Sequence, residues 1–188
     1  MLSRMKYITR WGLMNNTTGE NIGEHSLQTS MFAHLLVIIH NKNTGDNLNA
    51  ERAAVLGMYH DATEILTGDM PTPVKYYNPE MINSYKEVER IAGEKLVSML
   101  PEDLKSEYRS LILLENKEDK ELYKYVKAAD KLSALVKCIE EIRMGNDEFR
   151  QAKISTEKSI KNMGVPEAEE FLDKFLPSFS LTLDEISG

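Results

Sequence analysis

Two histidines and two aspartates, drawn from three segments of the chain, have side chains that can together hold one divalent metal ion. They are His25, the adjacent pair His60 and Asp61, and the downstream Asp130. First-row transition metals accept imidazole nitrogen and carboxylate oxygen together. A metal held in this way activates water for attack on a phosphorus centre. The sequence therefore predicts a metal-dependent hydrolytic site.

The surroundings of the two carboxylates strengthen this interpretation, because a His-Asp dipeptide by itself is a weak signal. Asp61 lies among Leu56, Gly57, Met58 and Ala62, and Asp130 also lies on or beside an apolar helical face. An unpaired carboxylate is costly to bury. A metal ion would supply the partner that two inward-facing carboxylates need.

Further residues have side chains suited to acid–base work and to anion binding. Glu64 lies four residues after His60, so in a continuous helix the two would share a face; a carboxylate there could orient water or take its proton. Asp69 follows next to a loop with two prolines and could assist a leaving oxygen. Arg10 has a guanidinium fork that matches phosphate oxygens, and Trp11, the only tryptophan, could stack on a base or sugar.

Helices are expected to position these residues, because alternating strand patterns with hairpin turns are absent. A helix over 23–40 would carry His25, and a second one, capped by Asn49, would carry His60, Asp61 and Glu64 to about residue 67. Other helices are expected at 3–9, 79–100, from Pro101, 119–144, 146–163 and for about ten residues before Pro177, with one more turn at 181–186. The sequence thus predicts an all-α fold.

The composition limits the class of protein. At 188 residues, with 41% hydrophobic and 28% charged residues, residues 1–188 are expected to form one domain. The net charge of -7 argues against nucleic-acid and anionic-membrane partners. A single cysteine excludes an internal disulfide, and the longest apolar run, 32–39, is too short for a bilayer. No signal peptide is visible, so a cytoplasmic location is expected.

With these residues assembled, the chain resembles the HD-domain hydrolase superfamily and, more closely, the bacterial 5'-deoxynucleotidases within it. The strongest match is His60-Asp61-Ala62-Thr63-Glu64 followed by Thr67-Gly68-Asp69-Met70-Pro71-Thr72-Pro73. Weaker matches lie at 8–11, 24–28, 127–130 and 177–179. The resemblance extends over nearly the whole length, with no departure at a functional position.

The resemblance implies an all-α HD-domain helical bundle that forms a homodimer. It also implies metal-dependent hydrolysis of deoxyribonucleoside 5'-monophosphates, supported by cobalt, manganese or a similar ion. The implied metal ligands are His25, His60, Asp61 and Asp130. The implied catalytic residues are Glu64, Asp69 and Arg10, and the implied substrate contacts are Arg10, Trp11, His25, Asp69, Met70, Pro71, Thr72 and Asp130.

Two other functions stay open at this stage. An HD phosphodiesterase or nucleoside-polyphosphate hydrolase would be expected to place more basic residues near the metal than Arg10 and Lys75. A non-catalytic helical module that binds a metal or nucleotide would not need Glu64 and Asp69. Discrimination against ribose is hypothesised to be steric, through Trp11 or the loop at Pro71.

Overall fold

The computed structural model describes residues 1–182 and 184–185, and within these ranges the chain is helical apart from its connecting loops and one isolated bridge between Thr9 and Asn21. The longer helices are α1 (Ile22–Thr44), α2 (Ala50–Tyr59), α5 (Pro79–Ser98), α6 (Lys105–Ile112), α7 (Tyr123–Arg143), α8 (Arg150–Asn162) and α9 (Pro166–Lys174). The short ones are η1 (Leu2–Tyr7), α3 (Glu64–Thr67), α4 (Thr72–Lys75), η2 (Glu102–Leu104), η3 (Lys117–Asp119), η4 (Asp147–Phe149) and η5 (Leu176–Ser180). The predicted all-α class is confirmed.

Asparagine side chains cap the N-termini of three of the longer helices, α1, α2 and α5. Asn49 accepts hydrogen bonds from the backbone N–H of Arg52, and Asn78 accepts one from that of Met81. Asn21 begins α1 with a full capping box, because its side chain accepts from the third helical residue, Glu24, which reaches back to the Asn21 N–H. These caps fix where the helices begin, and hence the depth at which His25 enters the core.

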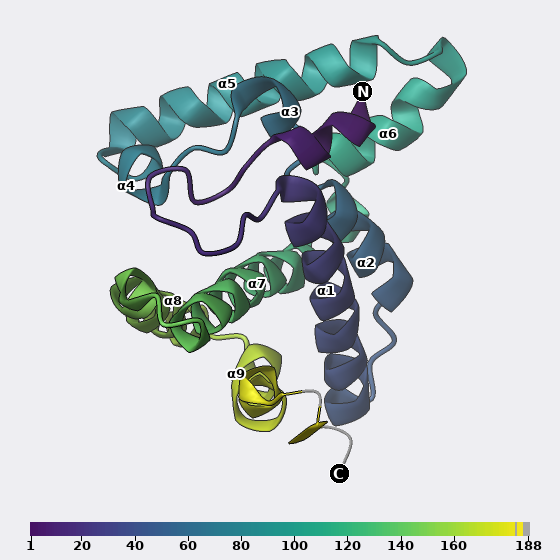
Figure 1. The fold of residues 1–188 in the computed structure, drawn as a ribbon. Helices are drawn as coiled ribbons and strands as arrows, with labels where there is room; N and C mark the ends of the chain where they lie inside the picture. The colour runs from purple at the N-terminus through teal and green to yellow at the C-terminus, as the bar shows by residue number, and fades with distance from the viewer. Residues whose placement is uncertain (183, 186–188) are drawn as a thin grey trace.

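The core lies where α1, α2 and α7 meet, and α5 with α6 lies across one end of this group (Figure 1). Leu36, Leu56, Leu132 and Leu135 are fully buried there. Gly57 lets α1 and α2 approach closely, since a Cβ atom at this position would lie only 2.9 Å from the Ser30 Cα. The residues predicted to bind a metal lie on α1, on α7 and in the turn that follows α2, so core packing also positions the site.

Two expected helices differ from the structure. The segment from Ala50 does not continue through His60: α2 ends at Tyr59, residues 60–63 form turns, and α3 begins at Glu64. His60 Nδ1 donates to the Gly57 carbonyl at 2.7 Å, and the following backbone N–H groups bond three residues back rather than four. The side chain thus competes with the backbone for this carbonyl, which ends the helix.

The N-terminal helix expected at 3–9 is a 3₁₀ helix over Leu2–Tyr7, and Thr9 pairs with Asn21 instead. The expected turn at 181–186 includes residues that lie outside the described ranges. No helix in the described ranges is long and apolar enough to cross a bilayer.

Candidate active site

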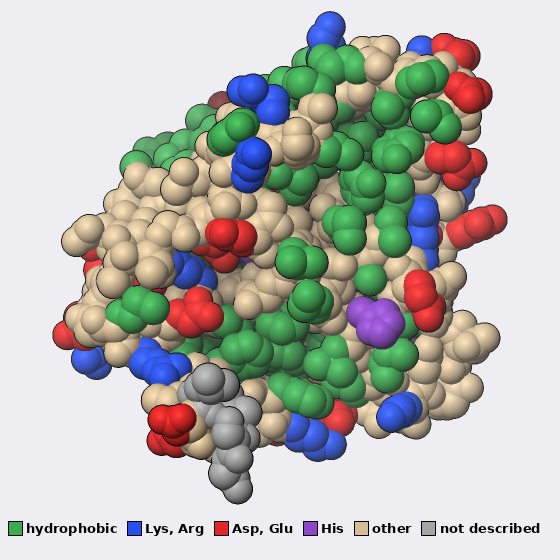
Figure 2. Space-filling view, turned by 45° about the vertical axis from the view of Figure 1, so that its right-hand side comes forward, with side chains coloured by type: hydrophobic (Ala, Val, Ile, Leu, Met, Phe, Trp, Pro, Cys, Tyr) green, Lys and Arg blue, Asp and Glu red, His purple; other side chains and the backbone are tan. Residues whose placement is uncertain are grey.

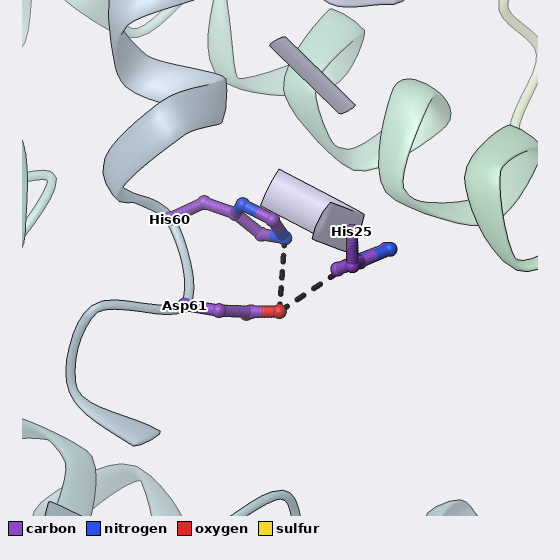
Figure 3. A group of neighbouring side chains, drawn as sticks. All are labelled: His25, His60 and Asp61. Carbon is purple, nitrogen blue, oxygen red and sulfur yellow. Dashed lines mark ion pairs between the residues drawn. The ribbon is translucent and has the colours of Figure 1, made fainter. Parts of the chain in front are cut away.

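His25, His60 and Asp61 come together although 34 residues of chain separate the two histidines. Each offers a ligand atom, and these atoms lie within 4.8 Å of one another. Asp61 Oδ2 lies 3.1 Å from His60 Nε2 and 3.6 Å from His25 Nε2, and Figure 3 shows both rings converging on this oxygen. The turn after α2 makes this possible, because adjacent residues of a continuous helix would point about 100° apart.

Asp130, on α7, joins the cluster through His25. Its Oδ1 lies 3.1 Å from His25 Nε2, and its Oδ2 lies 3.4 Å from the Lys131 ammonium. The structure therefore brings three predicted ligands together and places Asp130 beside one of them, the fully buried His25. The two carboxylates retain partial exposure, which leaves the cluster a face toward solvent.

Hydrogen bonds fix the orientation of both imidazoles. Ser133 donates its hydroxyl hydrogen to Gln28 Oε1 at 2.7 Å, so its oxygen accepts from His25 Nδ1–H at 2.9 Å. His60 Nδ1–H donates to the Gly57 carbonyl. In the neutral ring the remaining Nε2 atom then carries a lone pair. Such bonds to the second nitrogen are the usual way in which proteins orient metal-binding histidines.

Both Nε2 atoms face carboxylate oxygens, an arrangement that a cation placed between them would stabilise. His60 Nε2 is buried and has no hydrogen-bond partner. Two nitrogen and two oxygen donors form a set that suits a first-row divalent metal. The donor set, the orienting bonds and the unpartnered nitrogen together fit such an ion.

The pKa values show the same need for positive charge. Burial would raise the pKa of Asp61, but the His60 and His25 imidazoles outweigh it and lower this pKa to about 2. Burial likewise opposes ionisation of Asp130, yet His25 and Lys131 hold its pKa well below the ordinary value. Burial would lower the pKa of His60, whereas Asp61 raises it. The carboxylates are thus held as anions beside the two rings.

Glu64 is buried at the start of α3, and its Oε2 has no hydrogen-bond partner. Burial, together with the negative charges of Asp61 and Asp69, raises its pKa to about 9. The expected helix face shared by His60 and Glu64 does not exist, because the chain turns between them. Glu64 follows Asp61 by three residues, and its backbone N–H donates to the Asp61 carbonyl at 3.0 Å.

A cleft of about 680 Å³ is formed by two loops and two helices. One loop supplies Arg10 and Trp11, and the other supplies the predicted substrate contacts Asp69, Met70, Pro71 and Thr72. The two loops are joined by a hydrogen bond of 3.3 Å from the Trp11 backbone N–H to Asp69 Oδ2. The volume is of the size that small-molecule ligands occupy in proteins.

The far wall of this cleft was not anticipated from the sequence. It comprises side chains from α7 and α8, namely Lys131, Ala134, Ala152, Ser155, Thr156 and Ser159. Lys131 follows the predicted ligand Asp130 in the chain, whereas none of the four predicted ligands itself lines the cleft. Ser133 and Gln28 were also missed, although each lies three residues after a predicted ligand, Asp130 and His25, and so on the same helical face.

The sequence as a whole matches one known protein family. The sequence model of the family described as 5'-deoxynucleotidase YfbR-like matches residues 1–179. The chain belongs to this family of 5'-deoxynucleotidases. A 5'-deoxynucleotidase of Yersinia pestis (strain Pestoides F) is 51% identical over 186 residues, covering 99% of this chain and 94% of its own length. A 5'-deoxynucleotidase of Yersinia pseudotuberculosis serotype O:3 (strain YPIII) matches to the same extent.

Solved structures of other proteins share the fold of this 5'-deoxynucleotidase. An HD-domain phosphohydrolase from Listeria innocua has a TM-score of 0.79 at 22% identity, over 99% of this chain and 89% of its own. A cyanophage S-2L HD phosphohydrolase, described as bound to dA and one catalytic Zn²⁺ ion, has a TM-score of 0.63 at 20% identity, over 96% and 95% of the two chains. The HD fold and the hydrolase class predicted from the sequence are confirmed.

Proposed function

We propose that this 5'-deoxynucleotidase hydrolyses deoxyribonucleoside 5'-monophosphates to deoxynucleosides and phosphate, using one divalent metal ion held by His25, His60, Asp61 and Asp130. The observation that carries the ligand assignment is the pair of Nε2 lone pairs directed at carboxylate oxygens. When bound, the metal supplies a Lewis acid that polarises a phosphoryl oxygen and makes water a better nucleophile. The distant phage relative described with Zn²⁺ and dA supports a metal and a deoxynucleoside ligand.

Arg10 is proposed to bind the substrate phosphate. Its Nη1 donates to Glu20 at 2.7 Å, while its buried Nε has no partner. A guanidinium that is held at one end and free at the other can present a donor to an anion without losing its position. In a chain of net charge -7 this cation also offsets the repulsion that a phosphate would meet from the surrounding acidic residues.

Glu64 is proposed to orient the attacking water and accept its proton. Its carboxyl pKa of about 9 depends in part on the charge of Asp61. Neutralising that charge lowers the pKa and favours the ionised form, whereas burial, its largest cause, still opposes ionisation. An ionised carboxylate at this place can act as a general base.

Asp69 is proposed to assist the departing 5'-oxygen. Burial, reinforced by the Asp61 charge, raises its pKa although Arg10 opposes this. A carboxyl group with a raised pKa can donate a proton to a leaving oxygen. Trp11 would exclude a 2'-hydroxyl, and Met70, Pro71 and Thr72 would complete the nucleotide contacts along the cleft.

The test is phosphate release from deoxyadenylate and from adenylate, with metal-stripped protein to which cobalt or manganese is restored. We expect rapid release from the deoxy substrate only, dependent on metal and lost in Glu64→Ala. A Trp11→Ala variant should accept adenylate. Failure of the wild type to release phosphate from either substrate, with metal bound, would refute the proposal, and a preference for nucleoside triphosphates or phosphodiesters would replace it with an HD hydrolase of another substrate.

We also infer a homodimer in the cytoplasm. Exposed apolar side chains lie beside the close contact of Gly57 with Ser30, namely Leu27, Met31 and Met58, and Figure 2 shows hydrophobic side chains spread across one face of the molecule. Apolar surface of this kind is typical of subunit interfaces. Light scattering should give twice the chain mass, and Met31→Glu should halve it; a monomeric wild type would contradict the dimer. Cell fractionation would test the location.

A further inference from the structure

Glu20 contacts both residues that are proposed to recognise the phosphate and the sugar. Its Oε2 accepts a hydrogen bond from Arg10 Nη1 at 2.7 Å and one from the Trp11 indole Nε1 at 3.0 Å. The two backbones are linked as well, since the Arg10 N–H donates to the Glu20 carbonyl at 2.9 Å. One carboxylate oxygen therefore fixes the relative position of a cation and an aromatic ring.

Trp11 needs this support because its backbone is in an unfavourable conformation. Its φ is +60°, in the left-handed region that bulky residues rarely occupy. Such a conformation persists only where the surroundings over-determine it. The surroundings here are Glu20 at the indole nitrogen, Asp69 at the backbone N–H, and the Phe149 ring with its centroid 5.3 Å from that of Trp11.

Arg10 needs a restraint for an electrostatic reason. Its guanidinium is close enough to Asp61, Asp69 and Asp130 for each of these carboxylates to raise its pKa. Without an anion of its own, it would be drawn into an ion pair with the metal ligands or with the proposed acid. The Glu20 side chain is only 13% exposed, and its carboxylate pairs with the guanidinium at 2.7 Å, so it competes with those groups for Arg10.

We propose that Glu20 is the positioning residue that sets deoxyribose selectivity, by holding the Trp11 ring against the sugar while it leaves one edge of Arg10 free for the phosphate. This inference rests on the proposed function and names a residue that acts through two others. If Glu20 only anchored the loop, replacing it should have the same effect as replacing the other two glutamates that accept hydrogen bonds from this loop. Glu148 accepts from the Asn15 N–H, and Glu141 accepts from those of Thr17 and Thr18, so neither contacts Arg10 or Trp11.

The decisive variant is Glu20→Gln, whose side chain keeps the shape but loses the charge and one acceptor oxygen. Because charge-assisted bonds to two groups are weakened, we expect KM for deoxyadenylate to rise roughly tenfold with a smaller change in kcat. The ratio of kcat/KM for deoxyadenylate to that for adenylate should fall by a similar factor. Glu148→Gln, in η4 at another carboxylate that anchors this loop, should change neither value.

Fluorescence gives a second readout that does not depend on turnover. Trp11 is the only tryptophan, so the tryptophan emission of the protein, excited selectively over its tyrosines, comes from this residue alone. We expect acrylamide to quench Glu20→Gln more strongly than the wild type and Glu148→Gln, in metal-free protein as well. Glu20→Asp retains the charge on a shorter side chain, and it should give intermediate quenching and intermediate selectivity.

The outcomes separate this inference from the proposed function. If the wild type does not hydrolyse deoxyadenylate, the proposed function fails and the selectivity role fails with it, whatever the fluorescence shows. If the wild type is active while both Glu20 variants keep its selectivity and its quenching, Glu20 is not a positioning residue and the inference is overturned. If Glu20→Gln does not fold, Glu20→Asp decides between the same two results.

Discussion

The two sides of the candidate site are held in different ways. On the metal side, His25 and Asp130 project from α1 and α7, which pack in the core, and their orienting partners Ser133 and Gln28 come from the same two helices. On the nucleotide side, Arg10 and Trp11 lie on a loop that is fixed by individual carboxylates. Helix packing therefore positions the predicted metal ligands, whereas charged hydrogen bonds position the proposed substrate contacts. Variants that act on one side should leave the other intact.

The largest effect is expected from Asp61→Asn, which removes the charge on which both imidazoles converge. An amide can offer one neutral oxygen, so metal affinity should collapse and kcat/KM should fall on the order of 10³-fold or more. Metal content measured by elemental analysis and phosphate release would show this. The exposed Asp147→Asn serves as the control. Full metal content together with normal turnover would contradict the place of Asp61 in the ligand set.

A smaller effect is expected from Ser133→Ala, which removes the acceptor for His25 Nδ1–H. The ring would lose its orientation, and loss of such a partner costs roughly 10- to 100-fold in metal affinity. Competition with a chromophoric chelator measures this affinity. Ser26→Ala is the matched control. Ser26 lies on α1 and is buried like Ser133, but its hydroxyl has no hydrogen-bond partner. Equal affinities in the two variants would refute an orienting role for Ser133.

The dependence of the metal side on packing predicts that Gly57→Ala destabilises it without changing any charge. The added methyl group would overlap the α1 backbone at Ser30, at a cost of about 1–3 kcal/mol in the free energy of unfolding. Because Gly57 also accepts from His60, metal affinity should fall together with stability. Gly19→Ala, where a Cβ atom meets nothing within 4 Å, should be nearly neutral in denaturant titrations. Unchanged stability in Gly57→Ala would show that the two helices can separate freely.

The nucleotide side should also respond to pH. Burial would raise the pKa of Glu141, but Lys137, Asn146 and the N–H groups of Thr17 and Thr18 outweigh it and depress this pKa below its ordinary value of 4.5. A depressed pKa contributes stability that is fully present above the unfolded value and is lost as the pH falls toward the folded one. The gap in unfolding free energy between wild type and Glu141→Gln should therefore be constant above about pH 5.5 and shrink below pH 4.5. Urea titrations at pH 7, 4 and 3 would measure it, and an equal gap at pH 3 would contradict the charged anchor.

The helices and the His60-Asp61 pair could be predicted from the sequence because their signals are local, whereas their role as metal ligands stays a prediction. Asn49 and Asn78 announce helix starts within a few residues, and Asp61 carries its own partner, His60, beside it. The end of α2 at Tyr59 was not predicted. It depends on the His60 side chain, which bonds to the Gly57 carbonyl in place of a backbone N–H, and helix propensities do not include such a bond.

The loop contacts were missed for a different reason. The bond from Trp11 to Asp69 joins residues 58 positions apart, and the anchor from Glu141 to Thr17 spans 124. Glutamates are common on protein surfaces, so neither Glu20 nor Glu141 stands out by type or spacing. Their roles become visible only when the fold places each against particular donors. The sequence alone therefore indicated Arg10 and Trp11 but not what holds them.

The loop between Thr9 and Asn21 is closed at its base, because Arg10 bonds to Glu20 and Ile22 bonds to Ile8 through the backbone. These bonds join backbone groups at the two ends of the loop, so the ends can stay paired when side chains between them change. Sugar preference could thus diverge among related proteins by exchange of this segment alone, while the metal ligands stay unchanged. The exchange would have to include Glu141, since the tip of the loop is anchored to α7 and would otherwise arrive without its support.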